Sequence, residues 1–174
     1  MKNRNSFFVS ILIVLIVVLI LIYLLSKFLF LNVLTLEKSS DGEIIFQEQI
    51  NLGERFLLKY THSVAKTPVW EFFEINKKGD LVLVETHFLD HGAGLPYAAF
   101  DNEFFVNEDN RFKIKNMSRK ISLPLYYRIG KIRENYFVFK KNEIDLSKRA
   151  GDSVLLVNVL KMNLLNYLNV KYLN

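Results

Sequence analysis

The most hydrophobic part of the chain is its N-terminal segment, where residues 7–25 include no charged side chain. A helix of this length, at about 1.5 Å per residue, spans a hydrocarbon core of about 30 Å. The apolar character continues past Lys27, so we predict a transmembrane helix over residues 7–31. A cleaved signal peptide has a shorter apolar region that ends at a small-residue site. Residues 23–28 offer no such site, which favours an uncleaved signal anchor.

Lys2 and Arg4 precede this helix. Because basic residues favour the cytoplasmic side, residues 1–6 are predicted to be cytoplasmic and residues 33–174 to form a domain on the outer face of a single-pass membrane protein. The predicted helix itself contacts membrane lipid.

Beyond the anchor, short apolar-alternating segments are separated by turn residues, which predicts antiparallel strands. The turn sequences are SSDG (39–42), NLGE (51–54), NKKGD (76–80) and NEDN (107–110). The expected fold is all-β, a single antiparallel β-sandwich or barrel-like domain. In the C-terminal tail, residues 153–160 suit a buried strand and residues 161–169 a short helix, and the pattern leaves this choice open.

Charge and cysteine content exclude several classes of function. The chain has 23 basic and 18 acidic residues, and Lys2, Arg4 and Lys27 leave 20 basic against 18 acidic in the remainder. These charges are dispersed, as on a solvated surface, so no nucleic-acid partner is expected. The absence of cysteine excludes disulfides, thiol catalysis and cysteine-based zinc or iron–sulfur sites.

Residues 60–75 hold the first candidate site, because a glutamate interrupts an apolar run there. Alternation places Phe56, Leu58, Tyr60 and His62 on one face of a strand, and Val69, Glu71, Phe73 and Ile75 on one face of the next. If Leu58 lies opposite Ile75, then His62 lies opposite Glu71. This pair either closes the hairpin structurally or holds a ligand group or moves a proton.

Ser63 follows His62 directly, and adjacent strand residues point in opposite directions. The two side chains therefore do not form a dyad, and no G-x-S-x-G motif is present, which argues against a serine hydrolase.

The three histidines, His62, His87 and His91, invite a metal hypothesis. A four-residue loop at 76–79 pairs Ile75 with Asp80 and aligns Val82, Val84 and Phe88 with the Phe73 face. His87 then points to the opposite face from His62, and His87 and His91 straddle the end of a strand. We therefore expect no metal site and no cofactor.

The second candidate site is HGAGLPY, residues 91–97. Gly92 and Gly94 permit positive φ, so the backbone N–H groups around Ala93 can form a concave nest for an anion or carboxylate. The same stretch also suits an ordinary tight loop or bulge. The candidate ligand-binding residues are thus His62, Ser63, Glu71, Gly92, Ala93 and Gly94.

Together, T-H-S-V-x2-T-P-V-x-E and the later G-A-G-L-P resemble the bacterial family called domain of unknown function 1850, over residues 35–160. The matching positions are His62, Ser63, Val64, Thr67, Pro68, Glu71, Gly92, Ala93, Gly94, Leu95 and Pro96. The resemblance implies a small extracytoplasmic β domain, exported or anchored in a bacterial cell membrane. Such domains have no established activity and accompany TAXI-type TRAP transporters, which take up carboxylates. His91 departs from the Ser or Gly that the family carries there.

Three functions remain open. The first is a non-enzymatic accessory of such a transporter, which contacts its permease or its binding protein. The second is a small-molecule (carboxylate) binding module, and the third is an enzyme that uses His62 and Glu71. The residues contain no nucleophile elbow, metal set or phosphate loop, which favours a non-enzymatic role.

Overall fold

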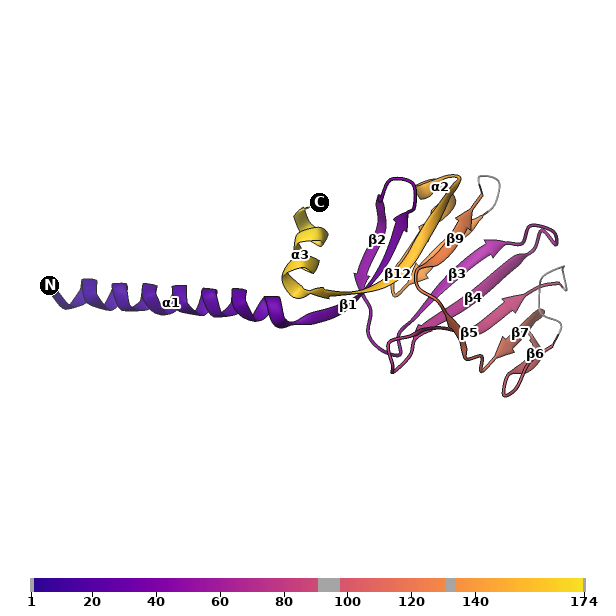
Figure 1. The fold of residues 1–174 in the computed structure, drawn as a ribbon, viewed down its shortest axis with the longest axis horizontal. Helices are drawn as coiled ribbons and strands as arrows, with labels where there is room; N and C mark the ends of the chain where they lie inside the picture. Colours follow the sequence, from indigo (N-terminus) through magenta and orange to yellow (C-terminus); the bar gives the residue numbers. More distant parts are fainter. Residues whose placement is uncertain (1, 91–97, 131–133, 174) are drawn as a thin grey trace. The chain divides into compact units, whose positions relative to one another are not determined.

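The computed structural model describes residues 2–90, 98–130 and 134–173, and side-chain burial within residues 6–171 of these ranges. The chain forms two compact units. The first, called here the membrane unit, comprises Met1–Val33 and Leu160–Asn174. The second, called here the β domain, comprises Leu34–Val159. Their elements are shown in Figure 1.

The structure has three helices and twelve strands among the described residues. The helices are α1 (Lys2–Phe28), α2 (Leu146–Ala150) and α3 (Leu164–Leu173). The strands are β1 (Phe30–Lys38), β2 (Ile44–Gln49), β3 (Arg55–Thr61), β4 (Pro68–Ile75), β5 (Leu81–Phe88), β6 (Phe104–Glu108), β7 (Arg111–Lys115), β8 (Arg119–Ile121), β9 (Leu125–Ile129), β10 (Asn135–Phe139), β11 (Asn142–Asp145) and β12 (Ser153–Asn163).

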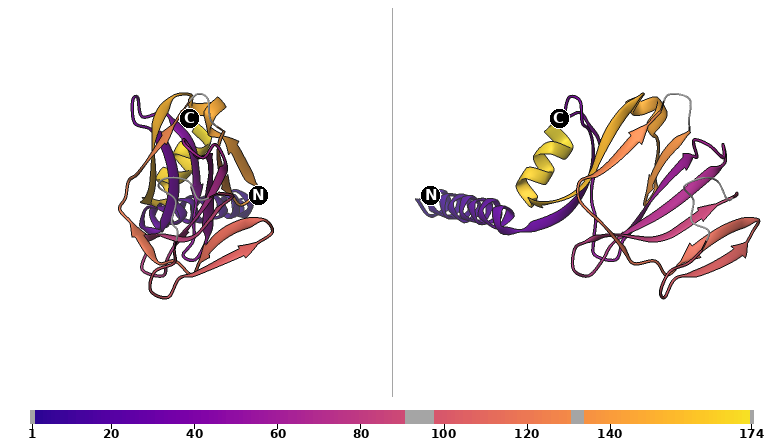
Figure 2. Two further views of the ribbon diagram at one scale, coloured as in Figure 1. Left: turned by 90° about the vertical axis from the view of Figure 1, so that its right-hand side faces the viewer. Right: turned by 45° about the vertical axis from the view of Figure 1, so that its right-hand side comes forward.

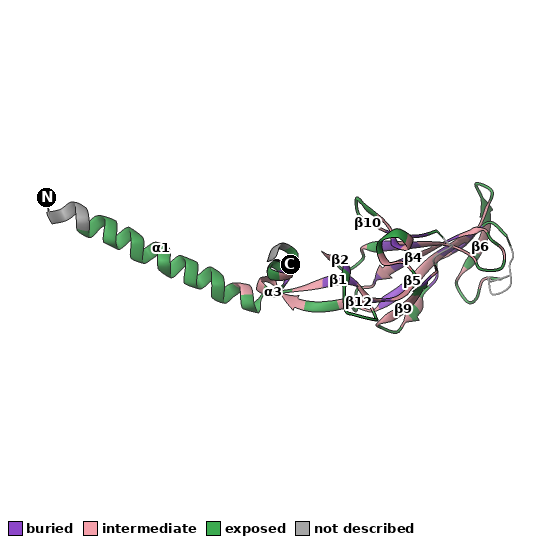
Figure 3. Cartoon of the chain, turned by 90° about the horizontal axis from the view of Figure 1, so that it is seen from above, coloured by how far each residue is buried: buried purple, intermediate pink, exposed green. Residues whose placement is uncertain are grey.

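Helix α1 supplies the apolar segment expected from the sequence. Its residues Ser6–Phe28 form a continuous helix that is long and apolar enough to cross a membrane, a property that signal sequences share. The large apolar side chains of this helix are exposed along its length, as the burial colours of Figure 3 show. An exposed apolar surface of this extent requires an apolar environment, because it is unfavourable in water.

The strands form two sheets. A four-stranded sheet has the order β2-β1-β12-β9, and an eight-stranded sheet has the order β11-β10-β3-β4-β5-β7-β6, with β8 paired to β5. The residue-by-residue strand pairings within the eight-stranded sheet are antiparallel, as is that of β9 with β12. Figure 2 shows the two layers from two further directions.

A shared core holds the two sheets face to face. The four-stranded sheet contributes Leu34, Leu36, Ile129, Leu155 and Val157, and the eight-stranded sheet contributes Phe56, Leu58, Phe73, Ile75, Leu81, Phe137 and Phe139. The rings of Phe56 and Phe73 stack with centroids 5.2 Å apart. Across the core, Phe46 of β2 lies 4.8 Å from Phe137 of β10. The predicted all-β sandwich is therefore confirmed.

The C-terminal tail combines both predicted alternatives. Strand β12 continues to Asn163, and α3 follows without an intervening loop. The transition is fixed by Asn163, whose Oδ1 accepts the backbone N–H of Asn166 at 2.8 Å. Such a cap satisfies one of the free amides of the first helical turn.

Candidate functional site

Four strand ends meet at the site that the sequence singled out. Cross-strand neighbours are Tyr60 of β3 with Val69 of β4, Val69 with Phe88 of β5, and Tyr60 with Asn135 of β10. The backbone N–H of Thr61 also donates to the carbonyl of Glu134 at 3.1 Å. The last residues of β3 and β5 and the first residues of β4 and β10 therefore lie together at one end of the eight-stranded sheet.

The predicted register of the β3–β4 hairpin is wrong. Leu58 pairs with Glu71 and Phe56 with Phe73, whereas the prediction placed Leu58 opposite Ile75 and His62 opposite Glu71. The reason is a tight turn, in which the backbone N–H of His62 donates to the carbonyl of Thr67 at 2.8 Å. Lys66 adopts a left-handed conformation with φ 57°, which closes the turn early. The shift is an even number of residues, so the predicted face of each residue is kept.

The side chain of His62 belongs to this turn. Its Nδ1 accepts the backbone N–H groups of Val64 at 3.3 Å and Ala65 at 3.1 Å. These bonds cap two amides that the tight turn leaves without strand partners. Ser63 is exposed in the same turn.

Glu71 meets Tyr60 in place of His62. The Tyr60 hydroxyl donates to Glu71 Oε1 at 3.3 Å. None of the ion pairs among the described residues includes Glu71. Burial raises the pKa of Glu71, while the hydrogen bond from Tyr60 lowers it and only partly offsets the effect of burial. The pKa of Tyr60 is raised by its own burial and by the nearby carboxylate.

A polar network extends from this pair to the opposite sheet. The ring of Tyr127 on β9 lies edge-on to that of Tyr60, with centroids 6.3 Å apart. The Tyr127 hydroxyl donates to Asn135 Oδ1 at 3.1 Å, and Asn135 Nδ2 donates to Ser147 Oγ at 3.1 Å. Burial, followed by the charge of Glu71, raises the pKa of Tyr127. The interior at this end of the sandwich is therefore polar and weakly acidic.

The β4–β5 hairpin matches the prediction only in part. Ile75 pairs with Leu81 and not with Asp80, and the register shifts by one residue between Phe72 and Phe73. Leu81 and Leu83 consequently lie beside Ile75 and Phe73, where the predicted register placed Asp80 and Val82. Beyond the bulge, Phe88 returns to the predicted face. A bulge adds one residue to one strand, so the side chains of that strand exchange faces on either side of it.

His87 pairs with Trp70, on the predicted face away from Glu71. Its Nε2 lies 2.6 Å from Glu85 Oε1, and its ring lies 4.8 Å from that of Phe72. Among the described residues, no group of three or more metal-binding side chains is found. His91 lies outside the described residues.

The glycine-rich candidate, residues 91–97 with Gly92, Ala93 and Gly94, also lies outside the described residues. The described residues before and after it converge on one point. Phe88 and Ala99 both pack in a cluster with Val69. Val69 precedes Glu71 on the same face of β4, so the two motifs are connected to neighbouring parts of the sheet.

A further concave region was not found from the sequence. On the face of the eight-stranded sheet turned away from the core, a cavity of about 530 Å³ is lined by Arg55, Glu74, Glu85, Asn76, Asn102 and Asn116, among others. Arg55 Nε donates to Glu74 Oε2 at 2.8 Å, and Asn116 Nδ2 donates to the carbonyl of Asn102 at 2.9 Å. These residues come from separate parts of the chain, and no local motif joins them.

The arrangement around Glu71 can offer hydrogen-bond donors to a ligand. A carboxyl whose pKa is raised stays protonated to a higher pH and can donate a hydrogen bond. Tyr60 and Tyr127 likewise keep their hydroxyl protons. Thr67 directly precedes β4, the strand of Glu71, and its Oγ1 is buried with no hydrogen-bond partner among the described residues.

Comparison with known proteins identifies one family. The model of a domain of unknown function (DUF1850) matches residues 56–146, a span that runs from β3 to the first residue of α2 and includes both candidate motifs. No curated protein and no solved structure shows a significant match to the chain.

Proposed function

The chain belongs to the DUF1850 family, and from this premise we propose that it is a membrane-anchored extracytoplasmic accessory protein that assists a TAXI-type TRAP carboxylate transporter. The family resemblance supports the choice of partner. Lys2 and Arg4, which precede α1, support the outward orientation of the β domain.

The observation that carries the proposal is the direct passage from α1 into β1. Helix α1 ends at Phe28 and β1 begins at Phe30, so only Leu29 separates the apolar helix from the first strand. One helix is too little to form a transport path by itself. It does hold an attached domain in the membrane plane, where a neighbouring permease meets it at high effective concentration.

Orientation is tested by single-cysteine labelling, because the chain has no cysteine of its own. Lys77→Cys places a thiol in the exposed β4–β5 turn, and Asn3→Cys places one before the helix. A membrane-impermeant maleimide applied to intact cells should label position 77 and spare position 3 until lysis. Labelling of position 3 alone would reverse the topology.

The accessory role is tested by gene deletion and by co-purification. Deletion should lower uptake of the transporter's substrate, and tagged protein should co-purify with the permease or its binding protein. A chain whose residues 1–28 are exchanged for an unrelated single-pass helix separates anchoring from specific helix contacts, and it should restore uptake if anchoring suffices. Normal uptake after deletion, together with no co-purification, would refute the role.

A second candidate function, binding of a small carboxylate, is favoured by the buried Thr67 hydroxyl and the raised pKa of Glu71. The unpaired Thr67 hydroxyl is one donor that suits a carboxylate ligand, and Glu71 is a second wherever its raised pKa keeps it protonated. Acetate and succinate should then raise the thermal midpoint of the wild-type protein and leave that of Thr67→Val, the isosteric variant, unchanged. Equal midpoints with and without these carboxylates would refute this function.

A further inference from the structure

Helix α3 starts where α1 ends. The backbone N–H of Leu164, its first residue, donates to the carbonyl of Leu29 at 2.8 Å, and the N–H of Leu29 donates to Leu25 at 3.1 Å. Leu29 thus directly continues the hydrogen-bond pattern of the apolar helix. If α1 spans a bilayer, this contact fixes the first turn of α3 at the depth where the chain leaves the hydrocarbon.

Exposed apolar side chains gather around this contact. Phe28 is 78 % exposed, and Leu29, Phe30 and Leu160 are exposed as well. On α3 itself, Tyr167 is only 6 % exposed, whereas Leu168 beside it is 39 % exposed. An isolated helix of ten residues is marginal in water, so α3 depends on its packing through Tyr167 and on its Asn163 cap. Leu168 is therefore available for contact with another apolar phase.

The net charge of the chain comes from the membrane unit. All 18 acidic residues lie within residues 34–159, together with 18 of the 23 basic residues. The membrane unit has no acidic residue and five basic ones: Lys2, Arg4, Lys27, Lys161 and Lys171. The formal charge of +5 therefore belongs entirely to this unit.

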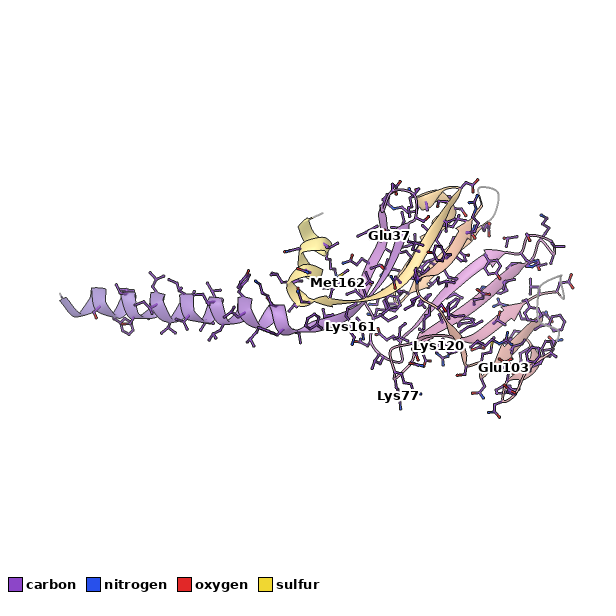
Figure 4. The ribbon with its side chains drawn as sticks, viewed as in Figure 1. Glu37, Lys77, Glu103, Lys120, Lys161 and Met162 are labelled. Carbon is purple, nitrogen blue, oxygen red and sulfur yellow. The ribbon has the colours of Figure 1, made fainter. Side chains whose placement is uncertain are left out.

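Three of these lysines lie in the last turn of α1 or in the C-terminal part of the unit. Lys27 is in the last turn of α1, with Nζ 4.7 Å from the Tyr23 ring centroid. Lys171 is in the last turn of α3, and its Nζ donates to the Tyr167 hydroxyl at 3.2 Å. Lys161 is exposed at the end of β12, beside Met162 in Figure 4. Lysine and tyrosine at a membrane boundary are typical of contact with lipid headgroups.

From this juxtaposition we propose that α3 is an interfacial helix, which lies in the headgroup region with Leu168 in the acyl boundary and binds anionic phospholipid through Lys27, Lys161 and Lys171. The inference rests on the proposed retention of α1 in the membrane. It adds a second membrane contact of defined lipid preference. A helix at the headgroup level gains from insertion of exposed apolar side chains and from attraction of its lysines to anionic lipid.

The test uses the full-length chain reconstituted in lipid nanodiscs. Leu168→Cys, the only thiol present, is labelled with an environment-sensitive fluorophore, and Lys77→Cys in the β4–β5 turn is the matched exposed position. In discs that contain phosphatidylglycerol, the fluorophore at 168 should be blue-shifted, quenched by headgroup-proximal nitroxide lipids and shielded from iodide. The fluorophore at 77 should remain accessible to iodide.

The charge contribution is measured by adding Lys161→Gln and Lys171→Gln to Leu168→Cys. Each lysine near an anionic surface strengthens binding about fivefold, so the double replacement should lower the ratio of docked to undocked α3 about 25-fold at low salt. Discs of phosphatidylcholine alone should give a larger loss, because the contribution of Lys27 is then removed as well. Unchanged Trp70 emission would show that the β domain remains folded.

Two outcomes would overturn the inference. Equal iodide access at positions 168 and 77 would show that α3 does not contact lipid. Equal docking in both lipids, and in the lysine variants, would remove the anionic preference. Neither outcome depends on a transporter, which is absent from the discs, so loss of this inference is distinguishable from loss of the accessory role.

Discussion

The hydrogen bond from Tyr60 to Glu71 predicts a pH-dependent loss of stability in Tyr60→Phe. The bond holds the pKa of Glu71 down against the effect of burial, so its removal makes the ionised carboxylate less favourable in the folded state. A hydrogen bond to a charged group contributes about 1.5–3 kcal/mol. The donor–acceptor distance of 3.3 Å is long for a hydroxyl donor, which places the expected loss at about 1.5 kcal/mol at pH values where Glu71 is ionised in the folded state.

The sign of the pH dependence follows from the direction of the pKa. Because the folded-state pKa of Glu71 lies above its usual value of 4.5, the folded state binds more protons, and stability falls as pH rises from 4.5 through the folded-state pKa. Below pH 4.5 the carboxyl is protonated in both states. There, Tyr60→Phe should lose only a neutral hydrogen bond, about 0.5–1 kcal/mol. Glu71→Gln should flatten the wild-type profile over the same window.

Urea unfolding of the full-length chain in detergent measures these effects. Trp70, the single tryptophan of the chain, neighbours Glu71 on β4, and its ring is covered by the guanidinium of Arg111 at 4.2 Å, so its fluorescence reports on this region. Tyr126→Phe is the matched control, because Tyr126 is 69 % exposed and should change stability by less than about 0.5 kcal/mol. If Tyr60→Phe costs the same in a Glu71→Gln background, the two side chains are not coupled and the reasoning fails.

Two further predictions concern other polar contacts. Asn135→Ala removes the acceptor of the Tyr127 hydroxyl and the donor to Ser147, so urea unfolding should show a loss of about 1–3 kcal/mol in the free energy of unfolding. Unchanged stability would contradict this role of the amide. Arg119 binds both oxygens of the Glu103 carboxylate, at 2.8 and 2.7 Å, and holds the pKa of Glu103 low. Arg119→Lys keeps the charge but loses the two-point geometry, so it should lower stability and shift acid unfolding to higher pH. An acid midpoint equal to that of the wild type would contradict this role.

The sequence was informative where a period decides the structure. Alternation correctly placed Phe56, Leu58 and Tyr60 on one face with Phe73 and Glu71, because strand side chains alternate with a period of two residues and the core requires one apolar face. The apolar run of α1 was equally direct, since its length and composition alone indicate a spanning helix.

Register and partners were not accessible from the same pattern. Lys66 closes the hairpin between β3 and β4 in a left-handed conformation. Glycine and asparagine are the residues that usually indicate this conformation, and neither occupies the position. The extra residue at the β4–β5 bulge likewise has no recognisable pattern in the sequence. Tyr60 was assigned to the correct face but not to Glu71, because a shift of four residues changes the opposing residue without changing the face. The cavity beside Arg55 and Glu74 joins residues whose separation in sequence hides their proximity.

The equal numbers of acidic and basic residues within residues 34–159 have a kinetic consequence. A protein surface with large net charge attracts an oppositely charged partner over long distances and accelerates encounter steeply at low salt. The β domain carries no such net charge, so encounter with a soluble partner should proceed at the ordinary unsteered rate of about 10⁵–10⁶ M⁻¹ s⁻¹. Ionic strength should alter that association rate little. Recognition by this domain is then decided by short-range fit after encounter. Under the proposed anchoring by α1, its search is shortened by confinement to two dimensions and not by electrostatic attraction.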